Sequence, residues 1–138
     1  MSISLNNPWS WVNVPVFESE GGCLVTCSRE QGLPFNLHRV FSITNVKGEC
    51  RRGNHANKKS KFVFVMLKGE CKVHVEALGR KSDFVLNTPA KGLYMKNMVW
   101  KEMYDFSHDA VLLVLSDSPY DPDEYINDHN EFLTIERK

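Results

Sequence analysis

The stretch FVFVMLKGECKVHVEAL (residues 62–78) carries the clearest secondary-structure signal in the chain. Its first part, residues 62–67, is an uninterrupted run of aromatic, β-branched and other apolar side chains, which is typical of a buried strand. Lys68-Gly69 is a turn signal. In the second part, residues 71–78, apolar and polar residues alternate, as in a strand with one solvated face. The stretch therefore predicts a β-hairpin with His74 on its polar face.

Strand-like segments continue on both sides of this stretch. They are rich in β-branched and aromatic residues, and turn signals built from glycine, proline, asparagine and serine separate them. They cover residues 11–17, 23–27, 37–46, 83–87, 92–95, 98–106 and 110–116. Many short strands at regular spacing predict an all-β sandwich or barrel.

Helical signals are concentrated near the C-terminus. Asp121 can cap a helix, Pro122 suits the first helical position, and Glu124 stands three residues after the cap. We expect a short helix over residues 122–130. Because capping accounts for both carboxylates, we expect structural roles for Asp121 and Glu124.

The composition is that of one globular domain, which we expect to span residues 1–138. The 138 residues are 42% hydrophobic, which is enough for a sizeable core. Seventeen basic residues balance seventeen acidic ones, so the chain lacks the field that attracts nucleic acids or anionic membranes. The segment MSISLNNPWSWV (1–12) lacks the basic start and long apolar run of a signal peptide. We expect a cytoplasmic protein that binds neither nucleic acid nor membrane.

The cysteines and the common motifs exclude several classes of chemistry. The four cysteines Cys23, Cys27, Cys50 and Cys71 form no CxxC pair and predict free thiols, not a disulfide framework or a zinc site. GxGxxG, the P-loop, GxSxG and HExxH are all absent from the sequence. Dinucleotide-binding, P-loop, serine-hydrolase and zinc-protease functions therefore lack their motifs.

The segment RRGNHANKKSK (51–61) combines a glycine, a histidine and five cations immediately before the apolar run at 62–67. A glycine followed two residues later by a histidine, ahead of a long central strand, resembles the first signature of the cupin fold, a small double-sheet jelly roll. Metal-binding cupins need further histidines and a carboxylate, where this chain has Asn57, Lys61 and Lys101. Amides and protonated amines are unsuitable ligands for transition metals. We therefore expect a cupin without a metal or other cofactor.

Longer segments of the chain resemble the sugar 3,4-ketoisomerases of the WxcM-like family. They are LPFNLHRVFSI (33–43), RRGNHANKK (51–59), GLYMKNMVWKEMYDFS (92–107) and VLSDSPYDPDEYI (114–126), in the family's order. The resemblance implies a cupin-type jelly roll that binds dTDP-4-keto-6-deoxyglucose or a close relative and moves its ketone from C4 to C3 without a metal, in deoxysugar and lipopolysaccharide biosynthesis. It also implies a homodimer with exchanged N-terminal strands.

The resemblance also indicates the catalytic positions. The reaction removes a proton at C3 and returns one at C4, which a group of pKa near neutrality, such as an imidazole, can do. His55 is the family histidine that remains. Asn57 stands at the family's second histidine, Lys101 stands where the family has histidine or arginine, and Gly21 stands where it has arginine or a large polar residue. Lys101 can hold a sugar oxyanion or, if desolvated, act as a base.

Cationic side chains are candidates for binding the diphosphate. Arg39 and Arg52 suit this role because a guanidinium group pairs bidentately with phosphate oxygens, and Lys58 and Lys59 can assist. The structural alternatives are an ion pair with a carboxylate for Arg39 and solvated surface positions for the lysines. His55 can likewise be a structural histidine that bonds a backbone group at a strand edge.

Aromatic side chains are candidates for stacking on the sugar or the base. Tyr94 and Trp100 can do so, although aromatic residues of small barrels are often part of the core. Glu102 is a further candidate substrate contact, but strand alternation puts it on the opposite face from Lys101.

Two other functions remain open at this point. The chain can be a non-catalytic module that binds a nucleotide-sugar or a partner enzyme, since Asn57 and Lys101 replace imidazoles. It can also be a related enzyme for another sugar nucleotide, including one with a 3,5-epimerase-like reaction.

Overall fold

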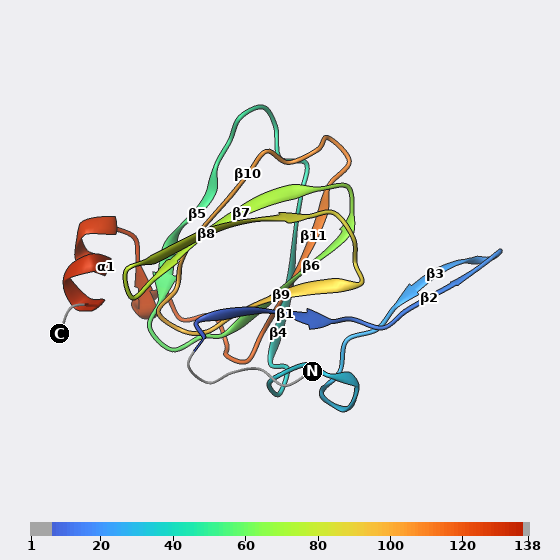
Figure 1. Cartoon of the computed structure of the whole chain (residues 1–138), viewed down its shortest axis with the longest axis horizontal. Coiled ribbons are helices and arrows are strands. Elements are labelled where there is room, and N and C mark those ends of the chain that lie inside the picture. The colour runs from blue at the N-terminus through green and yellow to red at the C-terminus, as the bar shows by residue number, and fades with distance from the viewer. Residues whose placement is uncertain (1–6, 137–138) are drawn as a thin grey trace.

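The computed structural model describes residues 7–136 and consists mainly of antiparallel β-strands (Figure 1). The strands are β1 (Trp9–Asn13), β2 (Val16–Ser19), β3 (Gly22–Val25), β4 (Arg39–Thr44), β5 (Arg52–Asn57), β6 (Phe62–Lys68), β7 (Cys71–Ala77), β8 (Arg80–Leu86), β9 (Lys91–Met95), β10 (Trp100–Tyr104), β11 (Val111–Ser116) and β12 (Tyr125–Ile126). Two 3₁₀-helices (Arg29–Gln31 and Pro122–Glu124) and the helix α1 (His129–Glu136) complete the described chain. The expectation of an all-β fold with a short C-terminal helix is confirmed in this respect.

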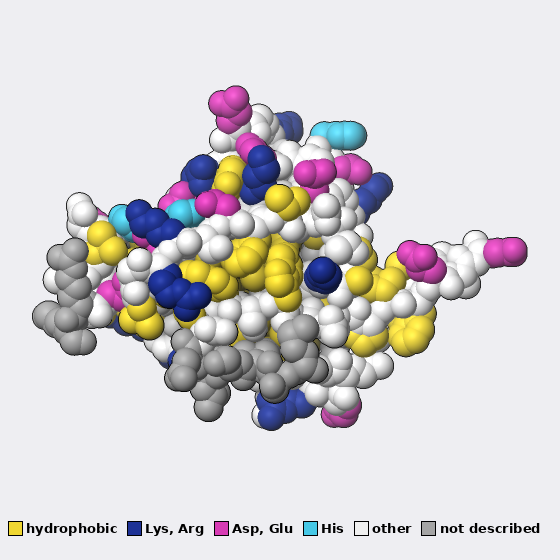
Figure 2. Space-filling view, in the orientation of Figure 1, with side chains coloured by type: hydrophobic (Ala, Val, Ile, Leu, Met, Phe, Trp, Pro, Cys, Tyr) yellow, Lys and Arg dark blue, Asp and Glu magenta, His cyan; other side chains and the backbone are white. Residues whose placement is uncertain are grey.

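The strands form two five-stranded sheets and a separate hairpin. One sheet has the order β1-β9-β6-β11-β4, and the other has the order β12-β5-β10-β7-β8. The hairpin β2–β3 projects from the body at the opposite end from α1 (Figure 1). A band of hydrophobic side chains crosses the face between β8 and β1 (Figure 2). The ring of Trp11 in β1 meets that of Phe84 in β8 edge-on, with 5.3 Å between the ring centres. Aromatic packing therefore closes the body at this side.

The main hydrophobic core fills the space between the two sheets. In β7 the side chains of Cys71, Val73 and Val75 are fully buried there, and the residues between them face outward. The predicted alternation of this strand is confirmed, and His74 lies on the outer face. In β6 both faces are buried: Phe64 lies in the core between the sheets, and Val65 packs in a second cluster on the outer side of its sheet.

The predicted hairpin over residues 62–78 is wrong, although both of its strands exist. β6 pairs with β9 and β11, whereas β7 pairs with β8 and β10 in the other sheet. The turn at Gly69 therefore crosses from one sheet to the other. Periodicity specifies that a segment is extended but not which strand it pairs with, and the apolar character of both faces of β6 fits a strand in the centre of a sheet.

The predicted helix over residues 122–130 is also displaced. Pro122–Glu124 forms a single 3₁₀ turn, β12 follows, and the helix starts at His129. Asp121 caps the turn, because its side chain accepts a hydrogen bond of 3.0 Å from the backbone N–H of Asp123. Phe132 of α1 packs against Trp100 and Ile126 at the end of the second sheet. Within residues 7–136 no helix is both long and apolar enough to cross a bilayer.

β5 is a strand that the sequence did not predict, because its composition is polar and it contains unusual backbone angles. Gly53 and Asn54 have φ values of +86° and +58°. A Cβ atom on Gly53 would lie 2.9 Å from the backbone oxygen of Lys101 in β10. Glycine at position 53 thus permits the close approach of β5 to β10 and the pairing of His55 with Lys101.

We predict that Gly53→Ala destabilises the fold by more than the backbone strain alone. A left-handed conformation costs an L-residue about 1–2 kcal/mol, and the contact with Lys101 adds to this cost because backbone atoms would have to move. Gly79→Ala is the matched control, since Gly79 has a φ of +77° but no atom within 4 Å of the added Cβ. Urea denaturation of both variants measures the difference. Equal losses of unfolding free energy would show that β5 and β10 are not held at this distance.

Candidate active site

A cavity of about 140 Å³ opens between the two sheets, at the end where β5 and β10 meet. Its walls combine apolar side chains with two cationic groups and one imidazole. The lining residues are Phe41, Ile43, Arg52, Gly53, His55, Phe62, Phe64, Lys101, Met103, Val114 and Tyr125. Three of the predicted site residues, His55, Lys101 and Arg52, therefore line the same cavity.

His55 presents a neutral imidazole to the cavity. The side chain comes from β5, and its ring lies 4.8 Å from the ring of Tyr125. Burial lowers the pKa of His55 to about 4, and the nearby charge of Lys101 acts in the same direction. At neutral pH the ring is therefore unprotonated and can accept a proton.

Lys101 places an amine in an almost fully buried position. The residue is 2% exposed and lies opposite His55 in the register of β10 and β5. Its Nζ donates a hydrogen bond of 3.0 Å to the backbone oxygen of Val99 and lies 4.9 Å from the centre of the Phe62 ring. Burial lowers the pKa of Lys101 to about 7, and the carboxylate of Glu124 opposes this shift. The amine can therefore both donate and accept a proton near neutral pH.

Asn57 lies behind the amine rather than in the cavity wall. It is 1% exposed, and its Oδ1 is 3.4 Å from Nζ of Lys101, which donates to it. Its Nδ2 is buried and has no hydrogen-bond partner among the described residues. A buried amide N–H without a partner is costly, and this one lies next to the amine that lines the cavity.

One of the two predicted arginines, Arg52, lines the cavity, and the other, Arg39, lies beside its wall. Arg39 lies on the same face of β4 as Phe41 and Ile43, which line the cavity. Its guanidinium group is 5.0 Å from the ring of Phe41 and 5.6 Å from the ring of Tyr120. Its Nε is buried without a hydrogen-bond partner within residues 7–136, so no carboxylate is bound there. Arg52 is exposed to solvent and also belongs to the wall.

The structure places four predicted substrate contacts away from this cavity. Tyr94 packs in the cluster on the outer side of the first sheet, and Trp100 packs against α1. Glu102 lies on the outer face, where it pairs with Arg51 at 3.0 Å. Lys58 has an exposed side chain beyond the end of β5. We therefore do not retain Tyr94, Trp100 and Glu102 as contacts in this cavity, because alternation along β9 and β10 turns them outward.

Glu124 does not have the capping role predicted for it. Its carboxylate is buried and accepts hydrogen bonds from the backbone N–H groups of Lys59 and Ser60, at 3.0 and 2.8 Å, and from the hydroxyl of Ser60. It thus anchors the turn between β5 and β6 to the segment before β12. This contact places Tyr125 beside His55, and the backbone of Tyr125 pairs with that of Asn57.

The sequence did not indicate three aromatic residues at or near the cavity. Phe41 and Tyr125 line it, and Tyr120 lies beside Arg39; they come from segments that were interpreted as a strand and as the start of a capped helix. A tyrosine at each end of PYDPDEYI was the available signal, but its meaning depends on the turn at Pro122–Glu124.

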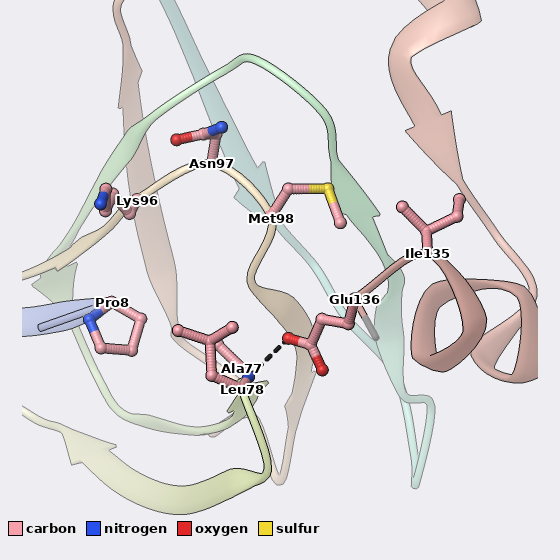
Figure 3. Close-up of a pocket in the computed structure, with 8 residues that line it drawn as sticks. All are labelled: Pro8, Ala77, Leu78, Lys96, Asn97, Met98, Ile135 and Glu136. Atoms are coloured by element: carbon pink, nitrogen blue, oxygen red, sulfur yellow. Dashed lines mark hydrogen bonds between the residues drawn. The ribbon is translucent and has the colours of Figure 1, made fainter. Parts of the chain in front are cut away.

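A larger pocket of about 360 Å³ lies beside α1 (Figure 3). Figure 3 shows Glu136 reaching from the helix to the turn after β7, where it accepts a hydrogen bond of 2.5 Å from the backbone N–H of Leu78. Pro8, Met98 and Ile135 supply apolar walls. None of the residues predicted to bind substrate lines this pocket, so it is not the candidate active site.

The chain resembles a group of characterised sugar-nucleotide enzymes. The family model described as FdtA: WxcM-like, C-terminal matches residues 7–137. The TDP-4-oxo-6-deoxy-alpha-D-glucose-3,4-oxoisomerase of Aneurinibacillus thermoaerophilus is 40% identical over 111 residues, which are 80% of each chain. Among solved structures, WlaRA, a TDP-fucose-3,4-ketoisomerase from Campylobacter jejuni, has a TM-score of 0.87 and 34% identity, covering 93% of this chain and 95% of its own.

A second solved structure adds a bound ligand. It is a histidine-to-asparagine variant of the 3,4-ketoisomerase QdtA from Thermoanaerobacterium thermosaccharolyticum in complex with TDP-4-keto-6-deoxyglucose. Its TM-score is 0.89 and its identity 29%, with 94% of both chains covered. An asparagine in place of one histidine is therefore compatible with binding of the keto sugar in that enzyme.

We predict that Lys101→Met raises the pKa of His55 above about 4 while leaving it below the ordinary histidine value of 6.5. The substitution removes the cation that disfavours imidazolium, whereas burial, the larger cause, remains. Titration of the His55 ring resonances by NMR measures the change. Lys91→Met removes an exposed lysine of β9 and is the control, which should leave His55 unchanged. An identical His55 titration in wild type and Lys101→Met would contradict the coupling.

Proposed function

The chain belongs to the FdtA family (WxcM-like, C-terminal), and on this premise we propose that it is a sugar-nucleotide 3,4-ketoisomerase acting on dTDP-4-keto-6-deoxyglucose or a close relative. The main structural support for the proposal is the cavity in which the neutral imidazole of His55 faces the buried amine of Lys101. We assign the two facing sheets to the cupin-type jelly roll, taken as a single domain. The proposed role is a step in deoxysugar biosynthesis.

The reaction is an internal transfer of hydrogen that needs no external oxidant. His55 takes the proton from C3, and the electron pair moves to form an enediolate with negative charge on O4. The C3 hydroxyl then loses its proton as the C3 ketone forms, and the protonated His55 returns a proton to C4. The ketone at C4 is reduced and the hydroxyl-bearing C3 is oxidised. The imidazole is unprotonated at neutral pH and can take the proton in the first step, and its conjugate acid returns a proton in the last.

In this proposal Lys101 exchanges protons with the sugar oxygens O4 and O3. Its ammonium form stabilises the developing charge on O4 and protonates it, and its amine form accepts the proton from O3. A pKa of about 7 makes both forms available at neutral pH. The unpartnered Nδ2 of Asn57 supplies a further hydrogen-bond donor beside the amine. Asn57 therefore acts in binding and orientation and carries no proton.

The mouth of the cavity suits the nucleotide part of the substrate. Arg39 and Arg52 offer guanidinium groups to the diphosphate, and Arg39 is held between the aromatic rings of Phe41 and Tyr120. The exposed ring of Tyr120 is available for stacking on a base. Lys58 remains a candidate for a longer-range contribution of positive charge.

The direct test is incubation of the purified chain with dTDP-4-keto-6-deoxyglucose. A 3-keto product is trapped by a sugar 3-aminotransferase, and exchange in deuterated water labels the carbon that receives the proton. We expect the trapped amine and the label. Binding of dTDP without product or label would instead indicate the non-catalytic nucleotide-sugar module, and gain of activity in an Asn57→His/Lys101→His variant would identify it as a degenerate isomerase. A thermal-shift series with dTDP, UDP and GDP sugars shows whether the chain binds another sugar nucleotide instead.

We predict a bell-shaped pH dependence of kcat/KM. His55 must be unprotonated to act as a base, so the rate rises with pH through about 4. Lys101 must be protonated to stabilise O4, so the rate falls as pH rises through about 7. Lys101→Met should remove the falling limb and lower the rate by a factor of about 100 to 10,000, whereas Lys91→Met should keep both limbs. A profile of Lys101→Met that matches wild type would refute the role of the amine.

We also propose a homodimer, in which the hairpin β2–β3 is the exchanged N-terminal element. β1 pairs with β9 of its own chain, so the hairpin is the part free to reach a second copy. Phe17 and Leu24 pair across it and are 59% and 58% exposed. β4 is an edge strand with Val40 52% exposed. An apolar hairpin and an open sheet edge complement each other through added strand pairing.

The dimer makes a prediction for solution mass. The double variant Phe17→Asp/Leu24→Asp should be monomeric, because it puts two charges into the proposed contact. Val85→Asp changes a 48% exposed side chain on β8 and is the control that should stay dimeric. Light scattering coupled to size exclusion gives the masses. A monomeric wild-type chain would rule out the exchange.

A further inference from the structure

A second cluster of functional groups lies on the outer face of the sheet, behind the candidate active site. His74 and Glu76 of β7 and Glu102 of β10 point away from the cavity, and the pairing of His74 with Glu102 in the strand register brings them together. One ligand atom from each of the three lies within 4.8 Å of the other two. Histidine and acidic side chains are gathered on this part of the surface, over β7 and β8 (Figure 2).

The contacts of His74 with two carboxylates require a positive charge between its ring and these groups. Its Nδ1 lies 3.2 Å from a carboxylate oxygen of Asp83, and its Nε2 lies 2.8 Å from a carboxylate oxygen of Glu76. A carboxylate has no proton to donate, so a neutral imidazole can satisfy one of these contacts but not both. In a neutral ring, the nitrogen of His74 that carries no proton directs its lone pair at a negatively charged carboxylate oxygen. Either a second proton or a metal ion must lie there.

The partners around the three groups are also those that a metal site would need. Asp83 is placed to accept from Nδ1–H of His74, which leaves the lone pair of Nε2 directed at Glu76. His129, the first residue of α1, lies 2.8 Å from the other oxygen of Glu76. A carboxylate behind a histidine ligand, and hydrogen bonds behind each carboxylate ligand, are the outer partners that fix metal ligands in proteins.

Hydrogen bonds also fix the orientation of the Glu102 carboxylate. Its Oε2 accepts a hydrogen bond of 2.7 Å from Nε1 of Trp100, and its Oε1 pairs with Arg51 at 3.0 Å. Each carboxylate oxygen has a second lone pair and can bind a cation while it keeps its existing partner. Asp83, His129 and Trp100 thus hold the three groups in place without using the positions that a metal would take, whereas the 2.8 Å contact between Nε2 of His74 and Glu76 would be replaced by bonds to the ion.

We propose that His74, Glu76 and Glu102 bind one divalent transition-metal ion of the zinc class through Nε2 and two carboxylate oxygens. Zinc–nitrogen and zinc–oxygen bonds of about 2.0–2.2 Å need ligand atoms that are closer together than the observed limit, so a small contraction closes the site. Water would be the fourth ligand. An imidazole among the ligands favours zinc, cobalt or nickel over magnesium or calcium. Two carboxylates balance the charge of the ion.

The location gives the proposed ion a structural role behind the catalytic strand. Glu102 and Trp100 flank Lys101 in β10, on the opposite face. The ion would join β7 to β10, and through Glu76 and His129 it would also steady the start of α1. The cysteines and the positions of the cupin ligands predicted no metal, and His74, Glu76 and Glu102 belong to neither set.

The test uses the full, tag-free chain after treatment with a chelator. Cobalt(II) is added alone, and its d–d absorption reports tetrahedral binding, while absence of thiolate charge-transfer bands excludes the cysteines. Calorimetry with zinc gives the stoichiometry. We expect one ion per chain, loss of binding in His74→Gln and Glu102→Gln, and a 10- to 100-fold weaker affinity in Asp83→Asn, as is typical of an outer partner.

The controls separate this site from nonspecific binding. His108→Gln removes an exposed histidine elsewhere and should bind cobalt like the wild type. Circular dichroism checks that each variant is folded, and Asp83→Asn, which alters an exposed side chain, covers the case in which His74→Gln does not fold. No tetrahedral cobalt spectrum, or the same affinity in all variants, would overturn the proposal and leave the cluster as an ion-pair network held by a second proton on His74.

Discussion

The close approach of β5 to β10 at Gly53 is the constraint on which the site depends. The separation leaves no room for a side chain there, because a Cβ atom would meet the backbone of Lys101 at 2.9 Å. The register at this point sets His55 directly opposite Lys101. Since Lys101 points between the sheets, its amine is removed from water by the same packing that builds the core. The chemistry of the pocket therefore follows from a backbone contact.

β10 also separates an apolar inner environment from a charged outer one. On its inner face Lys101 lies among Phe62 and other core residues, and no carboxylate of residues 7–136 is bonded to it. On its outer face Trp100 and Glu102 join a network of imidazoles and carboxylates. Strand alternation alone keeps the negative charges outside. If Glu102 faced inward, it would pair with Lys101 and hold its amine in the charged form.

The sequence predicted the secondary structure and the central residues of the site better than it predicted the pairing. Alternation in residues 71–78 and the apolar run at 62–67 were sufficient to locate two strands, but not to place them in different sheets, because pairing depends on distant partners such as β9 and β11. β5 escaped prediction since its left-handed residues and polar side chains contradict strand statistics. The helix was predicted too early in the chain, because a turn that begins with proline has the same start signals as a helix.

Among the predicted site residues, the motif indicated His55 and Lys101 and guanidinium chemistry indicated Arg52, and all three line the cavity. Tyr94, Trp100 and Glu102 face elsewhere. Alternation had already assigned Glu102 to the outer face, so the pattern was the better guide. Tyr125 could not be found from the sequence, because its position depends on the carboxylate of Glu124, which is bonded to the β5–β6 turn far away in the chain.

The presence of Asn57 and Lys101 where the sequence resemblance implies imidazoles is chemically coherent once burial is considered. An exposed lysine remains a cation far above neutral pH, whereas burial here lowers the pKa to about 7. Glu124 would reverse this shift if its carboxylate reached the amine, but its oxygens are bonded to Lys59 and Ser60. Asn57, being uncharged, holds the amine without adding a negative charge. The pair His55 and Lys101 thus has two well-separated pKa values, which is the condition for assigning one group as base and the other as acid.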